Sequence, residues 1–173
     1  MTIEKINEFL QSSTGNYLEI GVYHGDTFFK IAEANPTHKV YGIDPYISDG
    51  WTGQHRGTVL SDAEKTCDEK IKAFSNATIF KMTSDEFLKQ LVNPEEMNVV
   101  VVFIDGSHWH ECVQIDIDLA IKFIGDKKGL ILFDDLHIKG VRDAIVEGLS
   151  KYPQLQKTEC PQVFDMGGIY TVN

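Results

Sequence analysis

Residues 99–108 read Val-Val-Val-Val-Phe-Ile-Asp-Gly-Ser-His, six apolar residues that run directly into a carboxylate at Asp105. An apolar run without polar alternation predicts a strand that is covered on both faces, as in a parallel sheet. A second run, Leu130–Phe133, ends in the same way at Asp134 and Asp135. Because ligands of open α/β sheets bind at the carboxyl ends of the strands, the three acids predict a functional site at one edge of such a sheet.

Strand and helix patterns alternate along the rest of the chain. Strands are predicted at residues 16–22, 39–43, 78–82, 98–104, 129–133, 156–160 and 168–172. Helices are predicted at residues 2–12, 26–34, 61–74, 83–93, 111–124 and 141–151. This alternation predicts one domain over residues 1–173, a doubly wound, Rossmann-like three-layer α/β sandwich. Its mostly parallel, seven-stranded sheet is expected to end in an antiparallel C-terminal hairpin.

Two capping-box patterns mark the expected starts of helices, Ser61 with Glu64 and Thr83 with Glu86. A helix that begins at Thr83 is expected to stop near Asn93-Pro94. Residues 46–60 are interpreted as a long loop, and loops of this length are usually functional or mobile. Its polar and aromatic side chains, which either cover an acceptor as a lid or belong to a surface loop, are Trp51, Gln54, His55 and Arg56.

The composition narrows the class of partner. The net charge of −10, with no run of Lys and Arg, argues against nucleic acid, because phosphate binding depends on basic side chains. Cys67, Cys112 and Cys160 form neither a disulfide framework nor a metal knuckle, as expected for thiols in a reducing compartment. No signal peptide or membrane-spanning segment is recognisable, so a cytoplasmic protein without a membrane partner is expected.

A glycine turn follows the first predicted strand, in the segment Glu19-Ile-Gly21-Val-Tyr23-His-Gly25. Asp44 ends the next strand, 23 residues after Gly21, where an acid can bind a ribose diol. A dinucleotide site would have glycine at the position of Tyr23, and an added acid disfavours a pyrophosphate. S-adenosylmethionine carries an ammonium and a sulfonium and no phosphate, so this turn favours it over NAD.

The three acids at 105, 134 and 135 predict a second component of the site. Carboxylates that converge at one edge of a sheet repel one another unless a cation lies between them, and oxygen ligands suit Mg²⁺ or Mn²⁺. His108 follows Asp105 by three residues, and an ordinary histidine pKa near ~6.5 allows it to accept a proton at neutral pH. It is a candidate base, or else a helix-capping or supporting histidine; His110 and His137 are weaker candidates.

The sequence resembles class I S-adenosylmethionine-dependent methyltransferases, closest to the branch of metal-dependent sugar O-methyltransferases and more distantly to catechol O-methyltransferase. The segments that carry the resemblance lie within residues 15–150: Leu18–Gly25, Gly42–Pro45, Phe103–His108 and Ile131–His137.

The resemblance implies a role for each site residue. Cofactor-binding residues would be Glu19, Gly21, Tyr23, Gly25, Asp44, Thr83, Ser84 and Asp105, with Thr83 and Ser84 near the adenine. The implied metal ligands are Asp105, Asp134 and Asp135, and the implied catalytic residues are His108, as base, and Asp105.

The function expected on this basis is methyl transfer to a hydroxyl of a small molecule, such as a sugar, with help from a divalent cation. About 15 residues precede the first strand, so the acceptor pocket is expected from residues 46–60, 106–110 and 136–140, or from a second subunit of a homo-oligomer. The alternatives left open are a metal-independent methyltransferase, and a non-catalytic partner subunit that binds S-adenosylmethionine. An NAD-dependent sugar-modifying enzyme is disfavoured by the glycine turn.

Overall fold

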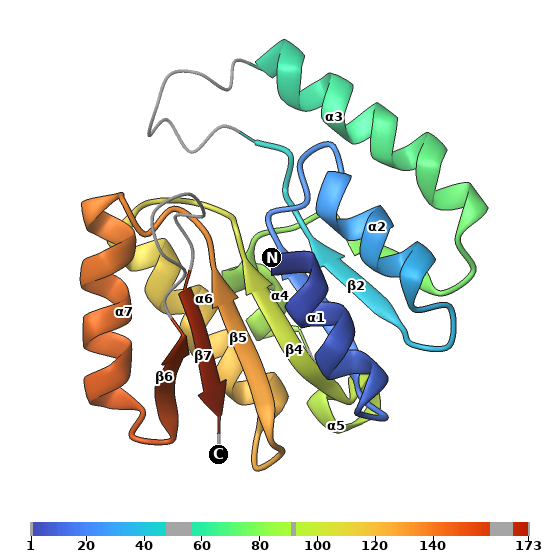
Figure 1. Ribbon diagram of the computed structural model, residues 1–173. Coiled ribbons are helices and arrows are strands. Elements are labelled where there is room, and N and C mark those ends of the chain that lie inside the picture. Colours follow the sequence, from blue (N-terminus) through green and yellow to red (C-terminus); the bar gives the residue numbers. More distant parts are fainter. Residues whose placement is uncertain (1, 48–56, 91–92, 160–167, 173) are drawn as a thin grey trace.

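The computed structural model describes residues 2–47, 57–90, 93–159 and 168–172, which are built around one sheet (Figure 1). The strands are β1 (Asn16–Ile20), β2 (Val40–Ile43), β3 (Ala77–Phe80), β4 (Val99–Ile104), β5 (Gly129–Phe133), β6 (Leu155–Glu159) and β7 (Gly168–Val172). Their order in the sheet is β3-β2-β1-β4-β5-β7-β6. Strands β1 to β5 pair in parallel, whereas β7 runs antiparallel to β5 and β6 antiparallel to β7. The predicted α/β class with a mostly parallel sheet is therefore confirmed.

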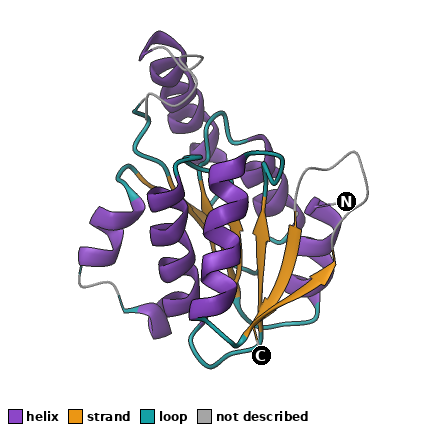
Figure 2. Cartoon of the chain, turned by 90° about the vertical axis from the view of Figure 1, so that its left-hand side faces the viewer, coloured by secondary structure: helices purple, strands orange, loops and turns teal. Residues whose placement is uncertain are grey.

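Helices cover both faces of this sheet (Figures 1 and 2). They are α1 (Thr2–Gln11), α2 (Asp26–Ala34), α3 (Gly57–Lys70), the short 3-10 helix η1 (Ile71–Ala73), α4 (Ser84–Lys89), α5 (Pro94–Met97), α6 (His110–Ile124) and α7 (Lys139–Lys151). One apolar core joins the sheet to α1, α2 and α3, and a second joins it to α4, α5, α6 and α7. None of the described helices is long and apolar enough to cross a bilayer.

The two apolar runs at residues 99–104 and 129–133 are the buried central strands that their composition predicts. Every residue of β4 and of β5 is buried. Their side chains divide between the two cores: Val102 and Ile104 pack on the side of α6, and Val101 and Phe103 pack on the side of α1 and α2. Because β4 lies beside β1, the chain changes direction across the sheet between these two strands, and the crevice at their carboxyl ends is where such folds bind ligands.

Two of the predicted helix boundaries are wrong, and one helix was not predicted. Helix α3 begins at Gly57, so Ser61 lies inside the helix and residues 57–60 do not belong to the predicted loop. Helix α4 ends at Lys89, well before Asn93. Pro94 then starts helix α5 instead of ending a helix, and the Asn93 side chain accepts the N–H of Glu95 (3.0 Å).

The second capping box is present as predicted. The Thr83 hydroxyl accepts the N–H of Glu86 (3.2 Å), and the Glu86 carboxylate accepts the N–H of Thr83 (2.8 Å). The predicted lid residues Trp51, Gln54, His55 and Arg56, and also Cys160, lie outside the described residues.

Candidate active site

The turns after β1, β2, β4 and β5 meet at one edge of the sheet, and the sheet's hydrogen bonds continue beyond the strand ends. The Asp44 N–H donates to the last carbonyl of β3 (3.0 Å), and the Asp105 N–H donates to the last carbonyl of β1 (2.8 Å). The Asp134 N–H likewise donates to the last carbonyl of β4 (3.0 Å). The backbone of each acid is therefore fixed by the neighbouring strand. For this reason, the ends of the predicted strands locate these acids well.

A cavity of about 390 Å³ opens at this edge. Most of the predicted site residues line it, namely Gly21, Tyr23, Asp44, Thr83, Ser84, Asp105, His108 and Asp135. Glu19, Gly25 and Asp134 are not part of its wall. The structure thus brings residues predicted to bind the cofactor and residues predicted to be catalytic together in one cavity. We call the part near Gly21, Asp44 and Ser84 the nucleotide end and the part near His108 and Asp135 the chemical end.

The glycine turn is shaped by close backbone contacts. Gly21 has φ +88°, and a Cβ atom there would lie 2.1 Å from the carbonyl oxygen of Asp105. Tyr23, at the position of a second glycine, also has a positive φ of 50°. The Asp44 carboxylate holds the turn by accepting the N–H groups of Val22 (2.9 Å) and Tyr23 (2.8 Å). Asp44 therefore supports the glycine turn as well as lining the cavity.

Glu19 lies beneath the turn and not on the cavity wall. Its side chain is 2% exposed and accepts the phenolic O–H of Tyr17 (2.6 Å). Burial raises the pKa of Glu19 well above its ordinary value, and the nearby charges of Asp105 and Asp44 raise it further, against the hydrogen bond from Tyr17. A contact between Glu19 and a cofactor remains a prediction, since the side chain is enclosed by protein.

At the other end of the cavity, His108 and Asp135 form a close pair. His108 Nε2 lies 2.7 Å from Asp135 Oδ2, and His137 Nδ1 lies 3.5 Å from Asp135 Oδ1. The hydrogen bond from His108 and the adjacent imidazoles lower the pKa of the Asp135 carboxyl. A carboxylate on Nε2 orients an imidazole and stabilises its protonated form, so His108 has the surroundings of a general base.

Two neighbours fix this pair. Asp135 adopts a left-handed conformation (φ +56°), and its N–H donates to the Asp134 carboxylate (2.8 Å). Asp134 therefore helps to hold the backbone from which Asp135 reaches His108. On the opposite side, a Cβ on Gly140 would lie 2.5 Å from the carbonyl oxygen of His108, so the first turn of α7 packs directly against the histidine's loop.

Asp105 lies in an unfavourable electrostatic setting. Burial raises its pKa to about 8, the charges of Asp134 and Asp135 add to the shift, and His108 opposes it. A carboxyl perturbed by burial and by specific neighbours, inside a cavity, is typical of a functional site. A bound cation would relieve this repulsion.

The predicted metal ligands are neighbours, but their side chains do not converge. Within residues 2–47, 57–90, 93–159 and 168–172, no three His, Cys, Asp or Glu side chains are arranged to hold a metal ion. Asp105 and Asp135 face the cavity, whereas Asp134 is turned toward the backbone of Asp135.

Asp116 of α6 also lines the cavity, although it is not among the site residues predicted from the sequence. Its side chain is 3% exposed, and the Ser84 hydroxyl donates a hydrogen bond to it. Burial raises the pKa of Asp116 to about 7. The signal was present in the sequence, because an acid three residues after Val113 and directly before Ile117 falls on the apolar face of the helix.

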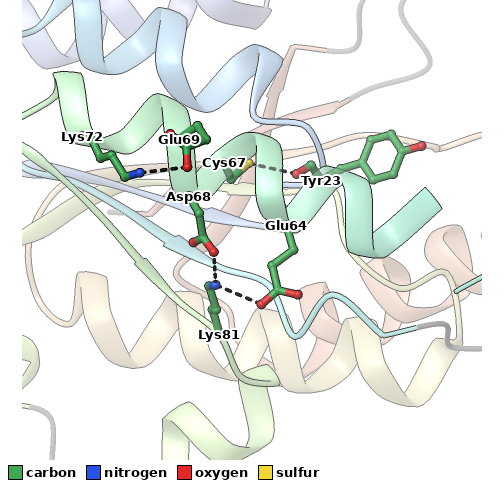
Figure 3. Close-up of polar contacts among 7 residues, drawn as sticks. All are labelled: Tyr23, Glu64, Cys67, Asp68, Glu69, Lys72 and Lys81. Atoms are coloured by element: carbon green, nitrogen blue, oxygen red, sulfur yellow. Dashed lines mark hydrogen bonds and ion pairs between the residues drawn. The ribbon is translucent and has the colours of Figure 1, made fainter. Parts of the chain in front are cut away.

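Helix α3 is tied to the cavity's nucleotide end by polar contacts (Figure 3). The Cys67 thiol donates to the carbonyl oxygen of Tyr23 (3.1 Å). Lys81, which follows β3, pairs with Glu64 (2.9 Å) and Asp68 (2.7 Å) of the helix. Leu60, near the start of the same helix, lines the cavity, so these contacts position one part of its wall.

Solved structures of methyltransferases share this fold. The chain superimposes on the apo structure of CalS11, a TDP-rhamnose 3'-O-methyltransferase of calicheamicin biosynthesis (TM-score 0.64, 14% identity, 98% of this chain and 76% of that one). It also matches a Staphylococcus aureus protein assigned as a caffeoyl-CoA O-methyltransferase (TM-score 0.68, 17% identity, 99% and 82%). A third match is the S-adenosylhomocysteine-bound Podospora anserina methyltransferase PaMTH1 (TM-score 0.63, 14% identity, 98% and 74%). At these identities the likeness establishes the fold.

Sequence comparisons add a relative and a family. The chain is 25% identical over 134 residues to the uncharacterized protein R132 of Acanthamoeba polyphaga mimivirus, covering 77% of this chain and 57% of that protein. It therefore spans little more than half the length of this relative. A family described as a methyltransferase domain matches residues 18–136, from β1 through the turn after β5, and so includes the glycine turn, Asp44, the Asp105–His108 loop and the Asp134–Asp135 pair. This chain belongs to that methyltransferase family.

Proposed function

We propose that this methyltransferase transfers the methyl group of S-adenosylmethionine to a hydroxyl group of a small molecule, with His108 as the general base. The observation that carries the proposal is the pair formed by His108 and Asp135 at 2.7 Å, on the wall of the cavity that also contains Asp105. A neutral amine attacks through its own lone pair and loses a proton only after methylation, whereas a hydroxyl needs a base aligned with it to become a good nucleophile. The pairing therefore favours an oxygen acceptor.

We infer the cofactor's position from the order of the strands. The turn at Gly21 provides close backbone approach for the methionine end, and Ser84 marks the nucleobase end beyond β3. Asp44 lies between them and is assigned to the ribose. A carboxylate has about four acceptor sites; Asp44 uses three of them for the N–H groups of Val22, Tyr23 and Tyr46, which leaves capacity for one ribose hydroxyl.

S-adenosylmethionine, when bound, would supply an electrophilic methyl group to the acceptor oxygen, and the electron pair of its carbon–sulfur bond would stay on sulfur. His108 takes the hydroxyl proton, and its Nε2 faces Asp135 Oδ2. Asp135 stabilises the imidazolium that results.

Three carboxylates near the cavity have oxygen atoms of the kind that bind a divalent cation. Asp105, Asp134 and Asp135 would hold Mg²⁺ or Mn²⁺, which would bind the acceptor oxygen and lower its pKa. The raised pKa of Asp105, which the charges of Asp134 and Asp135 help to cause, supports this assignment. No step above depends on the ion, because the Asp134 side chain as placed faces the Asp135 backbone.

We assign the acceptor to the class of small polar molecules that carry hydroxyl groups, such as sugars. The net charge of −10 supports a partner other than nucleic acid. The likeness to a TDP-rhamnose methyltransferase makes nucleotide-linked sugars a reasonable first set of acceptors. A second copy of the chain remains the proposed source of any pocket wall that residues 106–110 and 136–140 do not supply.

Calorimetric titration with S-adenosylmethionine and S-adenosylhomocysteine, with and without Mg²⁺ and with NAD as the comparison ligand, tests the cofactor. Micromolar binding of the first two is expected, and binding of NAD alone would refute the proposal. A screen of hydroxyl acceptors that measures S-adenosylhomocysteine formation tests the reaction. Cofactor binding without turnover of any acceptor would favour the non-catalytic partner subunit.

A further inference from the structure

Asp116 joins two loops that border the cavity. Its carboxyl receives the Ser84 hydroxyl from the turn after β3. On its other side, a Cβ built on Gly106, in the turn after β4, would lie 3.7 Å from Asp116 Oδ2. The carboxyl therefore lies between these two turns, and we call the part of the cavity that Ser84, Gly106 and Asp116 line the slot.

The Ser84 side of the slot lies away from the proposed chemical end, whereas Gly106 belongs to the turn that also carries Asp105 and His108. In the sheet, β3 and β5 lie on opposite sides of the β1–β4 pair. His108 and Asp135 follow β4 and β5, whereas Ser84 follows β3 and Asp44 follows β2. A ligand with its ribose at Asp44 and its reactive group at His108 places its nucleobase toward Ser84 and Asp116.

We propose that Asp116 recognises the exocyclic amino group of the cofactor's adenine and is a specificity-determining residue of this enzyme. This inference rests on the proposed use of S-adenosylmethionine. The amino group at C6 is a hydrogen-bond donor and a carboxyl oxygen is an acceptor, so the two are complementary.

The burial of Asp116 supports this role. A carboxyl with only 3% of its surface exposed is costly unless its acceptor sites are used, and the Ser84 hydroxyl fills one of about four. The pKa of Asp116, raised to about 7 by burial, shows that the surrounding protein compensates its charge poorly. A donor on the ligand would compensate it.

The competing role is purely structural, in which Asp116 only holds Ser84 and the start of α4 in place. The two roles differ in what they affect. A structural role would change the affinity for every ligand of the cavity by the same factor. Recognition of the amino group would change the affinity for adenine relative to a base that lacks this group.

Two probes separate these roles: S-adenosylhomocysteine, and its 6-deamino analogue with purine in place of adenine. Calorimetry on the wild type, Asp116→Leu and Asp116→Asn gives the ratio of the two affinities for each protein. Asp118→Leu is the matched control, because Asp118 lies on the same helix but pairs with Lys151 and Tyr152 outside the cavity. Thermal melts establish that each variant is folded.

At a pH above the pKa of Asp116, where its carboxyl is charged, the wild type is expected to bind the adenine compound about tenfold more tightly than the analogue. A factor of this size is the usual effect of one hydrogen bond to a charged group. The ratio should fall to about one in Asp116→Leu. It should be intermediate in Asp116→Asn, which keeps an acceptor oxygen without the charge. Asp118→Leu should keep the wild-type ratio.

A wild-type ratio near one overturns the proposal whether or not any variant folds. An unchanged ratio in folded Asp116→Leu also overturns it, and if this variant does not fold, an unchanged ratio in Asp116→Asn does so. If the wild type binds neither compound, the proposed cofactor itself is wrong, which is a separate result.

Discussion

The imidazole of His108 and the carboxylate of Asp135 lie 2.7 Å apart, although they belong to turns that follow two different strands. Parallel pairing of β4 with β5 brings these turns together. Gly140 adds a second constraint, because its lack of a side chain allows α7 to approach the His108 carbonyl. The position of the proposed base is thus set by the sheet and by a neighbouring helix.

His108→Ala should lower kcat for the hydroxyl acceptor by about 10²–10⁴-fold and leave the affinity for S-adenosylhomocysteine nearly unchanged, because the histidine serves the acceptor and not the cofactor. His110→Ala is the control, since His110 pairs with Glu147 of α7 (3.1 Å). Steady-state kinetics and calorimetry measure the two effects. Equal losses in both variants would argue against His108 as the base.

Gly21→Ala should destabilise the protein and weaken cofactor binding. The new methyl group would lie 2.1 Å from the Asp105 carbonyl oxygen, and the left-handed conformation alone costs about 1–2 kcal/mol. Gly125→Ala is a matched control, because Gly125 also has a positive φ but its Cβ would come only within 4.0 Å of the Lys122 carbonyl oxygen. Chemical denaturation should give the larger loss for Gly21→Ala, and equal losses would contradict the importance of the close contact.

Asp134 has two possible roles that substitution can separate. As a support for Asp135, it needs only an oxygen that accepts the Asp135 N–H, so Asp134→Asn should keep most of the activity and Asp134→Ala should lose it. As a ligand of Mg²⁺ it needs its charge, so Asp134→Asn should also be impaired. Turnover of both variants and of the wild type, with and without EDTA, distinguishes the roles. Wild-type turnover that is insensitive to EDTA would sink the metal-assisted mechanism.

The stability of the protein should depend on the protonation of Asp105. Its folded-state pKa of about 8 lies above the unfolded value of about 3.9. Between these values the folded protein retains a proton that the unfolded chain releases, so the free energy of unfolding falls as the pH rises. The upper bound of this effect is about 1.4 kcal/mol for each unit of pKa difference.

Asp105→Asn removes this contribution, so it should be more stable than the wild type at pH 8 and should gain little near pH 4. Urea denaturation across this range measures the difference. Mg²⁺ should restore part of the wild-type stability at pH 8 if the ion binds the carboxylate. Parallel stability curves for the two proteins would show that Asp105 is not perturbed.

The sequence predicted the acids well because they follow buried strands. An uninterrupted apolar run marks a central parallel strand, and the residue that follows it must lie at the carboxyl edge of the sheet. Asp105 and Asp135 line the cavity for this reason. Thr83 is a second success, because a capping box is local and its hydrogen bonds involve residues only three apart.

The errors arise where one local pattern permits two structures. A Ser-x-x-Glu pattern also occurs inside helices, so Ser61 did not mark the start of α3. Pro94 was interpreted as a stop, but proline is equally suited to the first turn of a helix, where its missing N–H costs nothing.

The sequence could not locate features that depend on tertiary contact. Gly140 is an ordinary glycine in the sequence, and its contact with the His108 carbonyl exists only after α7 packs on the sheet. The contact between Ser84 and Asp116 joins two helices in the same way.

Ionic strength should affect the two ends of the cavity differently. Lys81 holds α3 through exposed ion pairs with Glu64 and Asp68, which salt screens over a distance of about 8–10 Å. The wall at His108 is held instead by the close approach of α7 at Gly140 and by the largely buried pair of His108 with Asp135, which salt screens much less than an exposed pair. Kinetics between low and high salt should therefore show KM for S-adenosylmethionine rising while kcat stays constant, with Lys81→Met showing the raised KM already at low salt. The nucleotide end of this protein would then respond to its ionic surroundings while the chemical end would not.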